Sequence, residues 1–362
     1  MKKLKIAFLS AGTMTHAIPY LNYFHDRGHT VSWIIYDRPF KKIDVSAFPI
    51  YDISFGARGK SPFTKWKYFL SGIAIRKLLK ELKPDILHGH YVTSSGVICL
   101  ISGFTPYALT AHGSDVITSM KSPFWRTVLK YAFSKAALVN TVSEELEEYT
   151  RMLGVPQEKT WVATLGVDIN IFTYRTHHAL SNPVRLLCTR ALDHVYDPTT
   201  IINACVKLKE KNIPFTLTFA AGGPLLKHLE QFAHEKNLKD MIVFMGGYDN
   251  AKLPFLLQEH DIYVSASLWD GTSISLIEAM SCGIFPVVSR IKSNQAWLDD
   301  EVTCFMFDCE NPEELAQKII SAVSNESLRY NAIRKNRETV ESRGNRQNNM
   351  QLLEQHYYKI VK

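Results

Sequence analysis

The sequence predicts an α/β protein of two Rossmann-like, doubly wound domains, and three observations carry that prediction. The chain has 362 residues, enough for two cores at roughly 150 residues per domain. Short apolar runs alternate with segments of helical periodicity along most of its length, as in parallel sheets covered by helices on both faces. The alternation loosens in a polar, turn-rich stretch from Gly166 to Pro183 and then restarts, which indicates a linker between two domains.

The elements of the first half are short apolar strands and helices that end at a glycine or before a proline. The helix that begins near Ala17 ends at Gly28, for example, and the one that begins near Ile73 ends before Pro84. The predicted strands are 5–9, 30–36, 85–88, 107–111, 138–142 and 160–164, and the predicted helices are 17–27, 73–82, 93–101, 125–134 and 143–153.

The second half repeats this alternation, which predicts a second doubly wound domain. Its strands are predicted at 184–189, 215–220, 242–245, 262–265 and 285–288, and its helices at 199–211, 225–236, 252–258, 273–281 and 312–324. The last stretch, 338–361, is long, polar and weakly amphipathic. Ligands of open α/β sheets bind beyond the carboxyl ends of the strands, so we expect the site in a cleft between the two domains.

Composition excludes several classes of protein. Hydrophobic residues make up 46% and charged residues 21% of the chain, which is typical of globular proteins and unlike disordered ones. The six cysteines form no Cys-x-x-Cys pair and no zinc-finger pattern, so we expect a reducing, cytoplasmic location and no structural zinc. The basic and apolar start is similar to a signal peptide, but the polar segment Gly12–His16 interrupts it, which favours a first buried strand.

Positive charge is concentrated in the first half of the chain. The net charge is +7, with 22 Lys and Arg against 13 Asp and Glu in residues 1–175, and 20 against 22 in residues 176–362. The densest part is 57–83, where eight basic residues and several aromatic residues accompany a single acid, Glu81. Two interpretations are equal here: an anionic membrane surface or acceptor docks on this segment, or the segment is a solvated basic helix face. Nucleic acid is a weaker candidate, because no binding motif accompanies the charge.

A glycine pair follows the strand predicted at 215–220. Gly222 and Gly223 precede Pro224 and a helix; they allow a ligand to approach the backbone, and the free amides of a helix start favour phosphate. A plain strand-to-helix turn explains the pair about equally often. No Gly-x-Gly-x-x-Gly motif and no Walker loop occur, so dinucleotide binding has no direct support.

The most informative segment is 267–289, in which Asp270 and Glu278 are eight residues apart. A loop carries Asp270 and Gly271, and a helix begins near Ser273. Asp270 and the loop amides then offer acceptors for hydroxyl groups beside donors for phosphate, and Glu278, in an apolar stretch, needs a partner. The alternative is that Asp270 caps the helix and Glu278 is a surface charge.

An ordered set of motifs resembles family 4 glycosyltransferases. Asp270 and Glu278, followed by Ala-Met-Ser-Cys-Gly, resemble the Glu-x7-Glu signature of that family. The other matching motifs are, in order, the His-Gly loop Ala111–Asp115, Gly166–Asp168 with Phe172, Gly222–Pro224, 243–247 and 261–265. The set covers essentially the whole chain and is more specific than any single motif.

This resemblance implies a GT-B fold, in which two Rossmann-like domains face each other across a cleft. Residues 1–170, with a C-terminal helix at about 345–362, are then the acceptor-side domain, and 171–344 are the nucleotide-sugar domain. The implied activity is retaining transfer of a hexosyl or N-acetylhexosaminyl group from a nucleotide-sugar, on family frequency UDP-linked, to a glycan or lipid-linked acceptor in cell-envelope polysaccharide synthesis. No obligate metal and no other cofactor are expected, and the enzyme is expected in the cytoplasm, with peripheral contact to the inner face of the membrane.

Carried over by position, the resemblance implies a role for each site residue. Arg190 matches the diphosphate-binding Arg, a bidentate task that suits a guanidinium. Glu278 is expected to accept hydrogen bonds from ribose hydroxyls, and Asp270 to contact the donor sugar. His112 is expected near the reacting carbon, so that His112, Asp270 and Arg190 are the catalytic residues. The remaining donor-binding residues are Gly271, Thr272, Ser273, Ile274, Gly222, Gly223, Gly12 and Thr13, and the acceptor-side residues are His16 and His90. For His90, a hydrogen-bonded structural histidine is an equal alternative.

Two departures from the family pattern leave alternatives open. Aspartate replaces the usual first glutamate, and Tyr196-Asp197 stands near the place of the Lys-Gly that normally follows the Arg. A second phosphate-binding cation then has to come from elsewhere, with Arg290 and Lys292 as candidates. The rivals to transfer are a noncatalytic subunit that binds a nucleotide-sugar or glycan, and a nucleotide-sugar epimerase on the same scaffold.

Overall fold

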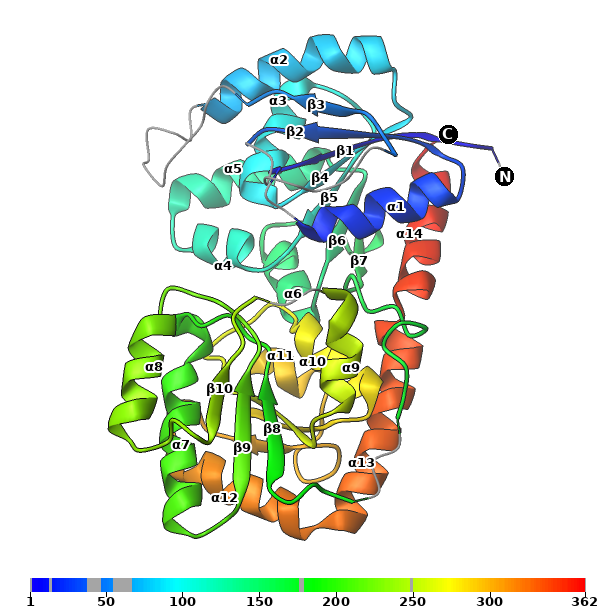
Figure 1. Ribbon diagram of the computed structural model, residues 1–362. Helices are drawn as coiled ribbons and strands as arrows, with labels where there is room; N and C mark the ends of the chain where they lie inside the picture. The colour runs from blue at the N-terminus through cyan, green and yellow to red at the C-terminus, as the bar shows by residue number, and fades with distance from the viewer. Residues whose placement is uncertain are drawn as a thin grey trace. The chain divides into compact units, whose positions relative to one another are not determined.

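The computed structural model describes residues 2–12, 15–37, 47–54, 67–175, 179–247 and 250–361. It divides into two compact units, Met1–Leu165 with Asn348–Lys362 (unit 1) and Gly166–Gln347 (unit 2). Each unit contains one parallel sheet with helices packed on it (Figure 1). The α/β class and the two doubly wound sheets predicted from the sequence are therefore confirmed.

The sheet of unit 1 has the strand order β3-β2-β1-β4-β5-β6-β7. Its strands are β1 (Lys5–Ser10), β2 (Thr30–Ile35), β3 (Ile50–Asp52), β4 (Ile86–His90), β5 (Tyr107–Ala111), β6 (Leu138–Thr141) and β7 (Thr160–Val162). Only the first residue of β1 is exposed, as expected for a parallel strand that is covered on both faces. The order reverses its direction between β1 and β4, and such a switch point leaves a crevice beyond the carboxyl ends of the two strands.

The helices of unit 1 are α1 (Ile18–Asp26), α2 (Lys67–Leu82), α3 (Val97–Ser102), α4 (Ser114–Met120), α5 (Pro123–Lys135), α6 (Glu144–Met152) and α14 (Arg346–Ile360), the last of which returns from unit 2. A π-helical turn, Val92–Gly96, precedes α3. Helix α3 packs against both α2 and α5 (Figure 1). Helix α14 lies against α1: Tyr357 stacks on Phe24 with ring centroids 5.1 Å apart, and Tyr23 donates a hydrogen bond to Glu354.

The sheet of unit 2 has the strand order β10-β9-β8-β11-β12-β13. Its strands are β8 (Val184–Cys188), β9 (Phe215–Phe219), β10 (Ile242–Phe244), β11 (Ile262–Ser265), β12 (Phe285–Ser289) and β13 (Phe305–Phe307). Its helices are α7 (Pro198–Glu210), α8 (Leu226–Glu235), α9 (Leu253–Gln258), α10 (Ile274–Cys282), α11 (Lys292–Gln295), α12 (Pro312–Ser324) and α13 (Glu326–Thr339). The switch point here lies between β8 and β11, so the loops that follow these two strands are placed beside one another.

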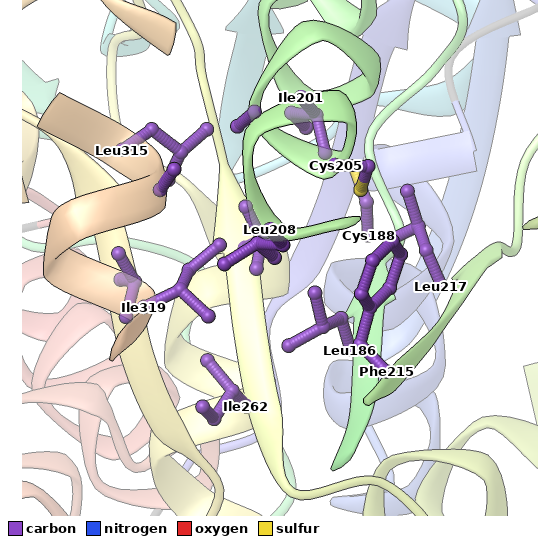
Figure 2. Close-up of a cluster of buried hydrophobic side chains, with 14 of the residues drawn as sticks. Leu186, Cys188, Ile201, Cys205, Leu208, Phe215, Leu217, Ile262, Leu315 and Ile319 are labelled. Atoms are coloured by element: carbon purple, nitrogen blue, oxygen red, sulfur yellow. The ribbon is translucent and has the colours of Figure 1, made fainter. Parts of the chain in front are cut away.

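Two buried clusters hold the helices of unit 2 to its sheet. Figure 2 shows the first, in which α7 and α12 cover the sheet through fully buried side chains such as Leu208 and Ile319. The second contains the apolar face of α10, including Ile277 and Met280. Burying a Leu or Ile side chain contributes about 1.5–3 kcal/mol. These buried contacts therefore fix the position of helix α10, whose first turn forms part of the candidate site.

The structure departs from the predicted elements mainly where segments are short or polar. The stretch 338–361 contains three elements: α13 ends at Thr339, a π-helical turn spans Val340–Gly344, and α14 begins at Arg346, beside the start of the C-terminal helix predicted at about 345–362. Gly344 packs closely, since an added Cβ would lie 3.0 Å from Ile277. The polar α13 and the three-residue strands β3 and β13 carry too few apolar positions for periodicity to detect them.

Candidate active site

In unit 2, Arg190 follows β8 and Asp270 lies in the loop after β11, on the two sides of the switch point. The Arg190 Nη2 donates to Asp270 Oδ2 at 2.6 Å, and Nη1 donates to the Oγ atoms of Ser273 (3.2 Å) and Ser275 (2.9 Å). The Arg190 and Asp270 side chains are 11% and 15% exposed, respectively. Burial disfavours the charged guanidinium, but Asp270 and the other neighbours outweigh burial and raise the pKa of Arg190. The cation is therefore fixed in place and permanently charged.

The residue near the place of the missing lysine contacts Arg190. The Tyr196 ring lies under the guanidinium, with Cζ of Arg190 4.1 Å from the ring centroid. Asp197 adopts a left-handed conformation (φ +39°) and caps α7 by accepting a hydrogen bond from the Thr200 amide. Tyr196-Asp197 thus supplies a ring for Arg190 and a helix cap, and adds no positive charge.

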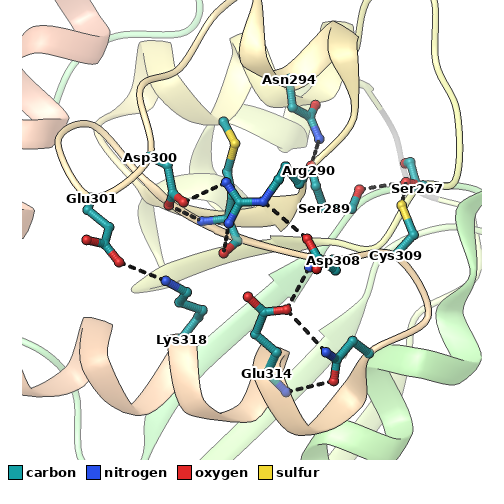
Figure 3. A network of polar contacts seen from close by, with 12 residues as sticks. Ser267, Ser289, Arg290, Asn294, Asp300, Glu301, Asp308, Cys309, Glu314 and Lys318 are labelled. Atoms are coloured by element: carbon teal, nitrogen blue, oxygen red, sulfur yellow. Dashed lines mark hydrogen bonds and ion pairs between the residues drawn. The ribbon is translucent and has the colours of Figure 1, made fainter.

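Arg290, one candidate for a second phosphate-binding cation, is already paired. Its Nη1 lies 2.8 Å from Asp300 and its Nε lies 3.2 Å from Asp308 (Figure 3). Both carboxylates neutralise the guanidinium, which is 35% exposed. Arg290 is therefore a poor candidate for a phosphate-binding cation.

The start of α10 offers backbone donors beside Arg190. Ser273 is the N-cap, and its Oγ accepts a hydrogen bond from the Leu276 amide at 3.2 Å. Within the described part of the chain, the amides of Ile274 and Ser275 have no protein acceptor. Gly271 is buried and Thr272 is half-buried. The free amides and the helix dipole make this end of α10 suited to an anion.

Glu278 lies one turn further along α10. Its side chain is half-buried, and none of the described residues forms a hydrogen bond with its carboxyl group. Burial raises the pKa of Glu278 to about 7, while the charges of Arg346 and Arg190 lower it. A desolvated carboxyl without a hydrogen-bond partner costs stability, which is typical of functional sites.

The glycine pair packs against the loop that follows Arg190. The Leu192 amide donates to the Gly222 carbonyl at 3.1 Å, and an added Cβ at Gly223 would lie 2.3 Å from the Leu192 carbonyl oxygen. An added Cβ at Gly222 would meet nothing within 4 Å. Gly223 is therefore required by close packing, whereas Gly222 leaves its backbone exposed.

In unit 1, the loop after β5 holds His112. Gly113 adopts φ +128° and ψ −82°, a conformation that suits glycine. The buried Asp115 fixes this loop, since its carboxylate accepts hydrogen bonds from the amides of Gly113 (2.8 Å), His112 (3.2 Å) and Val92 (2.8 Å). Burial, with a smaller effect of His16, lowers the pKa of His112 to about 3. His112 is therefore neutral at pH 7.

His90 is fully buried, which favours the alternative of a structural histidine over a contact with the acceptor. His90 is 0% exposed because it stacks on His88 (ring centroids 4.5 Å apart) and packs against Tyr20 and Phe8. Its Nδ1 lies 3.2 Å from His112 Nε2. His90 therefore contacts the His112 ring and helps to position it.

The other predicted residues of unit 1 are less constrained. Gly12 is buried after β1 and donates to the Asp37 carbonyl at 3.3 Å, and His16 is exposed on the 3-10 turn Thr15–Ala17. Thr13 lies outside the described residues.

Two site features were not predicted from the sequence. Tyr91, directly after β4, has φ +75°, and its hydroxyl forms a 2.8 Å hydrogen bond with Ser114. A positive φ is rare for an aromatic residue and marks candidate functional positions. Ser275 joins the Arg190 cluster. In the sequence, Tyr91 is indicated only by its place after a strand, which is a weak signal. No local feature of the sequence indicates that Ser275 contacts Arg190.

The described part of the chain offers neither a cluster of metal ligands nor a membrane-spanning helix. It contains no group of three His, Cys, Asp or Glu side chains that could hold a metal ion. None of its helices combines the length and the apolarity that crossing a membrane requires.

Comparisons with known proteins match both units. A model of the family described as Glycosyl transferases group 1 matches residues 172–339, and a model described as Glycosyl transferase 4-like matches residues 5–143. WcaL of Salmonella typhimurium, named as a colanic acid biosynthesis glycosyltransferase, is 26% identical over 188 residues, or 50% of this chain and 46% of WcaL. The match to WcaL thus spans about half of that protein. The UDP-Gal:alpha-D-GlcNAc-diphosphoundecaprenol alpha-1,3-galactosyltransferase of Escherichia coli is 24% identical over 278 residues, 71% of this chain and 70% of that enzyme.

A solved structure shows the same fold. The crystal structure of HepE from Anabaena in complex with UDP has a TM-score of 0.79 at 16% identity, covering 98% of this chain and 100% of that one. This likeness confirms the two-domain α/β fold of the GT-B type.

Proposed function

We propose a specific transfer reaction for this chain, which is a glycosyltransferase of the GT-B type related to family 4. The protein transfers a hexosyl or N-acetylhexosaminyl group from a UDP-sugar to a glycan or lipid-linked acceptor. The transfer retains the anomeric configuration and belongs to cell-envelope polysaccharide synthesis. The names of its relatives support the substrate classes: WcaL is named for colanic acid, the E. coli relative for a diphosphoundecaprenol acceptor, and HepE was crystallised with UDP.

The observation that carries the proposal is the cluster at the start of α10. Arg190 and the free amides of Ile274 and Ser275 offer positive charge and donors to a diphosphate. The unpaired carboxyl of Glu278, one turn away, offers acceptors for the hydroxyls of a ribose. Asp270 accepts a hydrogen bond from Arg190 through one oxygen, which leaves its other oxygen for a sugar hydroxyl.

These groups suit a reaction whose charge develops on the leaving diphosphate. Arg190 is held before substrate binds, so it stabilises that charge without reorganising. No protein nucleophile is required if the leaving phosphate takes the acceptor proton on the same face. His112, neutral at pH 7, contacts the donor sugar as a hydrogen-bonding group and not as a competing cation. No metal takes part in this proposed mechanism.

A donor panel tests the proposal. UDP-, GDP- and ADP-linked hexoses and N-acetylhexosamines are incubated with the protein, and released nucleotide and the anomeric configuration of the product are measured. We expect release from UDP-sugars, its loss in Glu278→Ala, and its retention in the matched control Glu259→Ala, an exposed glutamate on the same unit. Full activity of Glu278→Ala would contradict the assignment, and an altered donor without nucleotide release would indicate an epimerase.

One observation favours a second candidate, a noncatalytic subunit that binds nucleotide-sugar. Asp270 neutralises Arg190, and Tyr196 stands near the place of the second cation. Such a subunit binds UDP in calorimetry and shows no turnover with any donor of the panel.

The proposed location is cytoplasmic, with peripheral contact to the membrane. The basic segment 57–83 is the surface predicted for that contact. Its first part, 57–66, lies outside the described residues, and the rest lies in α2.

A further inference from the structure

A row of three histidine rings leads from the interior of unit 1 to His112. His88 and His90 belong to β4, and both are 0% exposed. Their rings stack with centroids 4.5 Å apart, and His90 Nδ1 lies 3.2 Å from His112 Nε2. Burial lowers the pKa of His88 to about 3 and holds the pKa of His90 well below its usual value. Like His112, both rings are therefore neutral at pH 7, and a neutral imidazole carries its proton on only one of its nitrogens.

The surrounding hydrogen bonds identify the nitrogen that carries the proton in His88. Asn140 Nδ2 donates to backbone carbonyl oxygens at 3.1–3.3 Å, which turns Asn140 Oδ1 towards Thr110. The Thr110 hydroxyl donates its single proton to Asn140 Oδ1 at 3.2 Å. At its 2.8 Å contact with His88 Nε2, Thr110 therefore accepts, so the proton of His88 lies on Nε2. His88 Nδ1 in turn accepts a hydrogen bond from the hydroxyl of Tyr357 in α14.

The proton of His90 follows from a buried atom that has no partner. His90 Nε2 is buried, and none of the described residues forms a hydrogen bond with it. A buried N–H group without an acceptor is rarer in proteins than a buried acceptor without a donor, so Nε2 is the nitrogen without a proton. His90 Nδ1 therefore carries the proton and donates it to His112 Nε2 in a hydrogen bond. Because His112 Nε2 is used as an acceptor, the proton of His112 lies on Nδ1.

We propose that His90 is a positioning residue that fixes His112 as the tautomer with its proton on Nδ1. The inference rests on the proposed function, in which His112 contacts the donor sugar. None of the described residues forms a hydrogen bond with His112 Nδ1, so this N–H is left to donate to an oxygen atom of the ligand. His112 then has no nitrogen free to accept a proton, which excludes it as the general base of the transfer.

The tautomer of His112 is measurable in the free protein. The full chain is labelled with nitrogen-15 in its histidines, and two-bond proton–nitrogen correlation spectra at pH 7 distinguish the two neutral tautomers. The His112 signals are those that disappear in His112→Asn. We expect the proton on His112 Nδ1, and a proton on Nε2 in the wild type overturns the proposal. This measurement uses no donor and no acceptor, so it decides the tautomer even if the proposed function fails.

Two substitutions separate the hydrogen bond of His90 from its packing. His90→Asn places an amide N–H near the position of Nδ1, whereas His90→Leu fills the space without a donor. We expect His90→Asn to keep the proton on His112 Nδ1 and to lose little turnover. His90→Leu is expected to show both tautomers of His112 and to lower kcat about 10- to 100-fold, because the His112 ring loses its fixed donor position. Packing alone would make His90→Leu the milder change, and that order overturns the proposal.

His260→Leu is the matched control. His260 is a buried histidine of unit 2, with Nδ1 2.7 Å from the Leu256 carbonyl oxygen and Nε2 3.0 Å from Thr218 Oγ1. Its removal also costs buried hydrogen bonds, but the His112 signals and kcat are expected to stay as in the wild type. Equal changes of the His112 signals in His260→Leu and His90→Leu overturn the proposal. UDP affinity by calorimetry is expected to be unchanged in the His90 variants, because the proposed nucleotide-binding groups belong to unit 2.

Discussion

At the scale of single residues, the candidate site combines a guanidinium that is paired with a carboxylate, Arg190, with a carboxyl group that has no hydrogen-bond partner among the described residues, Glu278. Arg190 has a carboxylate, two hydroxyls and an aromatic ring around it, so its position is set before any ligand arrives. Glu278 has none of these partners. The fixed guanidinium of Arg190 favours stabilisation of a charge that develops during the reaction. The carboxyl group of Glu278 favours binding of a ligand that brings hydroxyl groups.

Arg190→Ala is expected to lower kcat about 10²- to 10³-fold, the usual effect of removing a donor that stabilises transition-state charge. Steady-state release of UDP from the preferred donor measures this. The control is Arg185→Ala, because Arg185 is 44% exposed and lies 3.8 Å from its partner Asp261. Turnover unchanged in Arg190→Ala would show that another cation stabilises the leaving group.

Glu278→Gln is expected to stabilise the protein at alkaline pH. Because burial raises the folded pKa of Glu278 to about 7, ionising the carboxyl costs free energy that appears as pH rises from about 4.5 to 7 and is complete above 7. The amide avoids this cost. The free energy of unfolding at pH 8 should therefore rise by about 1–3 kcal/mol, with little change at pH 4.

Urea denaturation at the two pH values measures the difference, and Glu259→Gln serves as the control. Equal stability of Glu278→Gln and the wild type at pH 8 contradicts the assignment of a desolvated carboxyl. If Glu278→Gln is more stable than the wild type but binds UDP more weakly, Glu278 serves ligand binding at a cost in stability.

At the scale of elements, the loops after β8 and β9 and the helix α14 are each held by specific contacts. The Leu192 backbone lies against Gly223, and Glu354 of α14 lies among Tyr23, Arg27 and His29. These contacts join segments that are distant in the sequence.

Gly223→Ala is expected to lower the free energy of unfolding by about 1–3 kcal/mol, because the new Cβ overlaps the Leu192 carbonyl oxygen 2.3 Å away. Gly222→Ala is the matched control, with an expected change within about 0.5 kcal/mol, since its Cβ meets no atom. Thermal denaturation of both variants measures this. A larger loss of stability in Gly222→Ala than in Gly223→Ala would contradict the close packing of the loops after β8 and β9.

Glu354→Gln is expected to cost about 1–3 kcal/mol at pH 7, because three hydrogen bonds to a buried carboxylate are weakened. Burial raises the pKa of Glu354, but the hydrogen bonds from His29 and Tyr23 and the charge of Arg27 outweigh burial and lower it. The stabilisation that the Glu354 carboxylate provides is therefore present above about pH 4.5. It is lost as the pH falls through the pKa that Glu354 has in the folded protein.

Unfolding curves at pH 7 and pH 3 check the Glu354 prediction. The wild type is expected to lose its advantage over Glu354→Gln at the lower pH. An advantage that is the same at both pH values would mean that the charge of Glu354 is irrelevant to the packing of α14.

At the scale of the whole molecule, each unit has its own sheet and its own buried clusters. The proposed nucleotide-binding groups Arg190, Asp270, Ile274 and Glu278 all belong to unit 2. His112 and the loop that holds it belong to unit 1.

Saturating UDP is expected to stabilise unit 2 by about 2.7 kcal/mol at a concentration 100-fold above its Kd. Scanning calorimetry with and without UDP measures the shift. Glu278→Ala should remove most of it, whereas Glu259→Ala should retain it. An equal UDP shift in Glu278→Ala would place the nucleotide elsewhere.

The sequence alone determined the α/β class, the two doubly wound sheets and the family, because hydrophobic periodicity and ordered motifs are local properties of the chain. It also selected Arg190, Asp270 and Glu278, which the structure places just after β8, in the loop after β11 and on α10 of one unit. It could not show that Arg190 pairs with Asp270, since that contact joins residues 80 positions apart.

Only the tertiary structure decided the environments of these groups. It buried His90, paired Arg290 with two carboxylates, and left the carboxyl group of Glu278 without a hydrogen-bond partner among the described residues. It also returned α14 to unit 1, where Glu354 meets His29 across 325 positions of sequence. The reason is physical: periodicity records which side of an element is apolar, whereas burial, charge pairing and pKa depend on which distant segments pack against it.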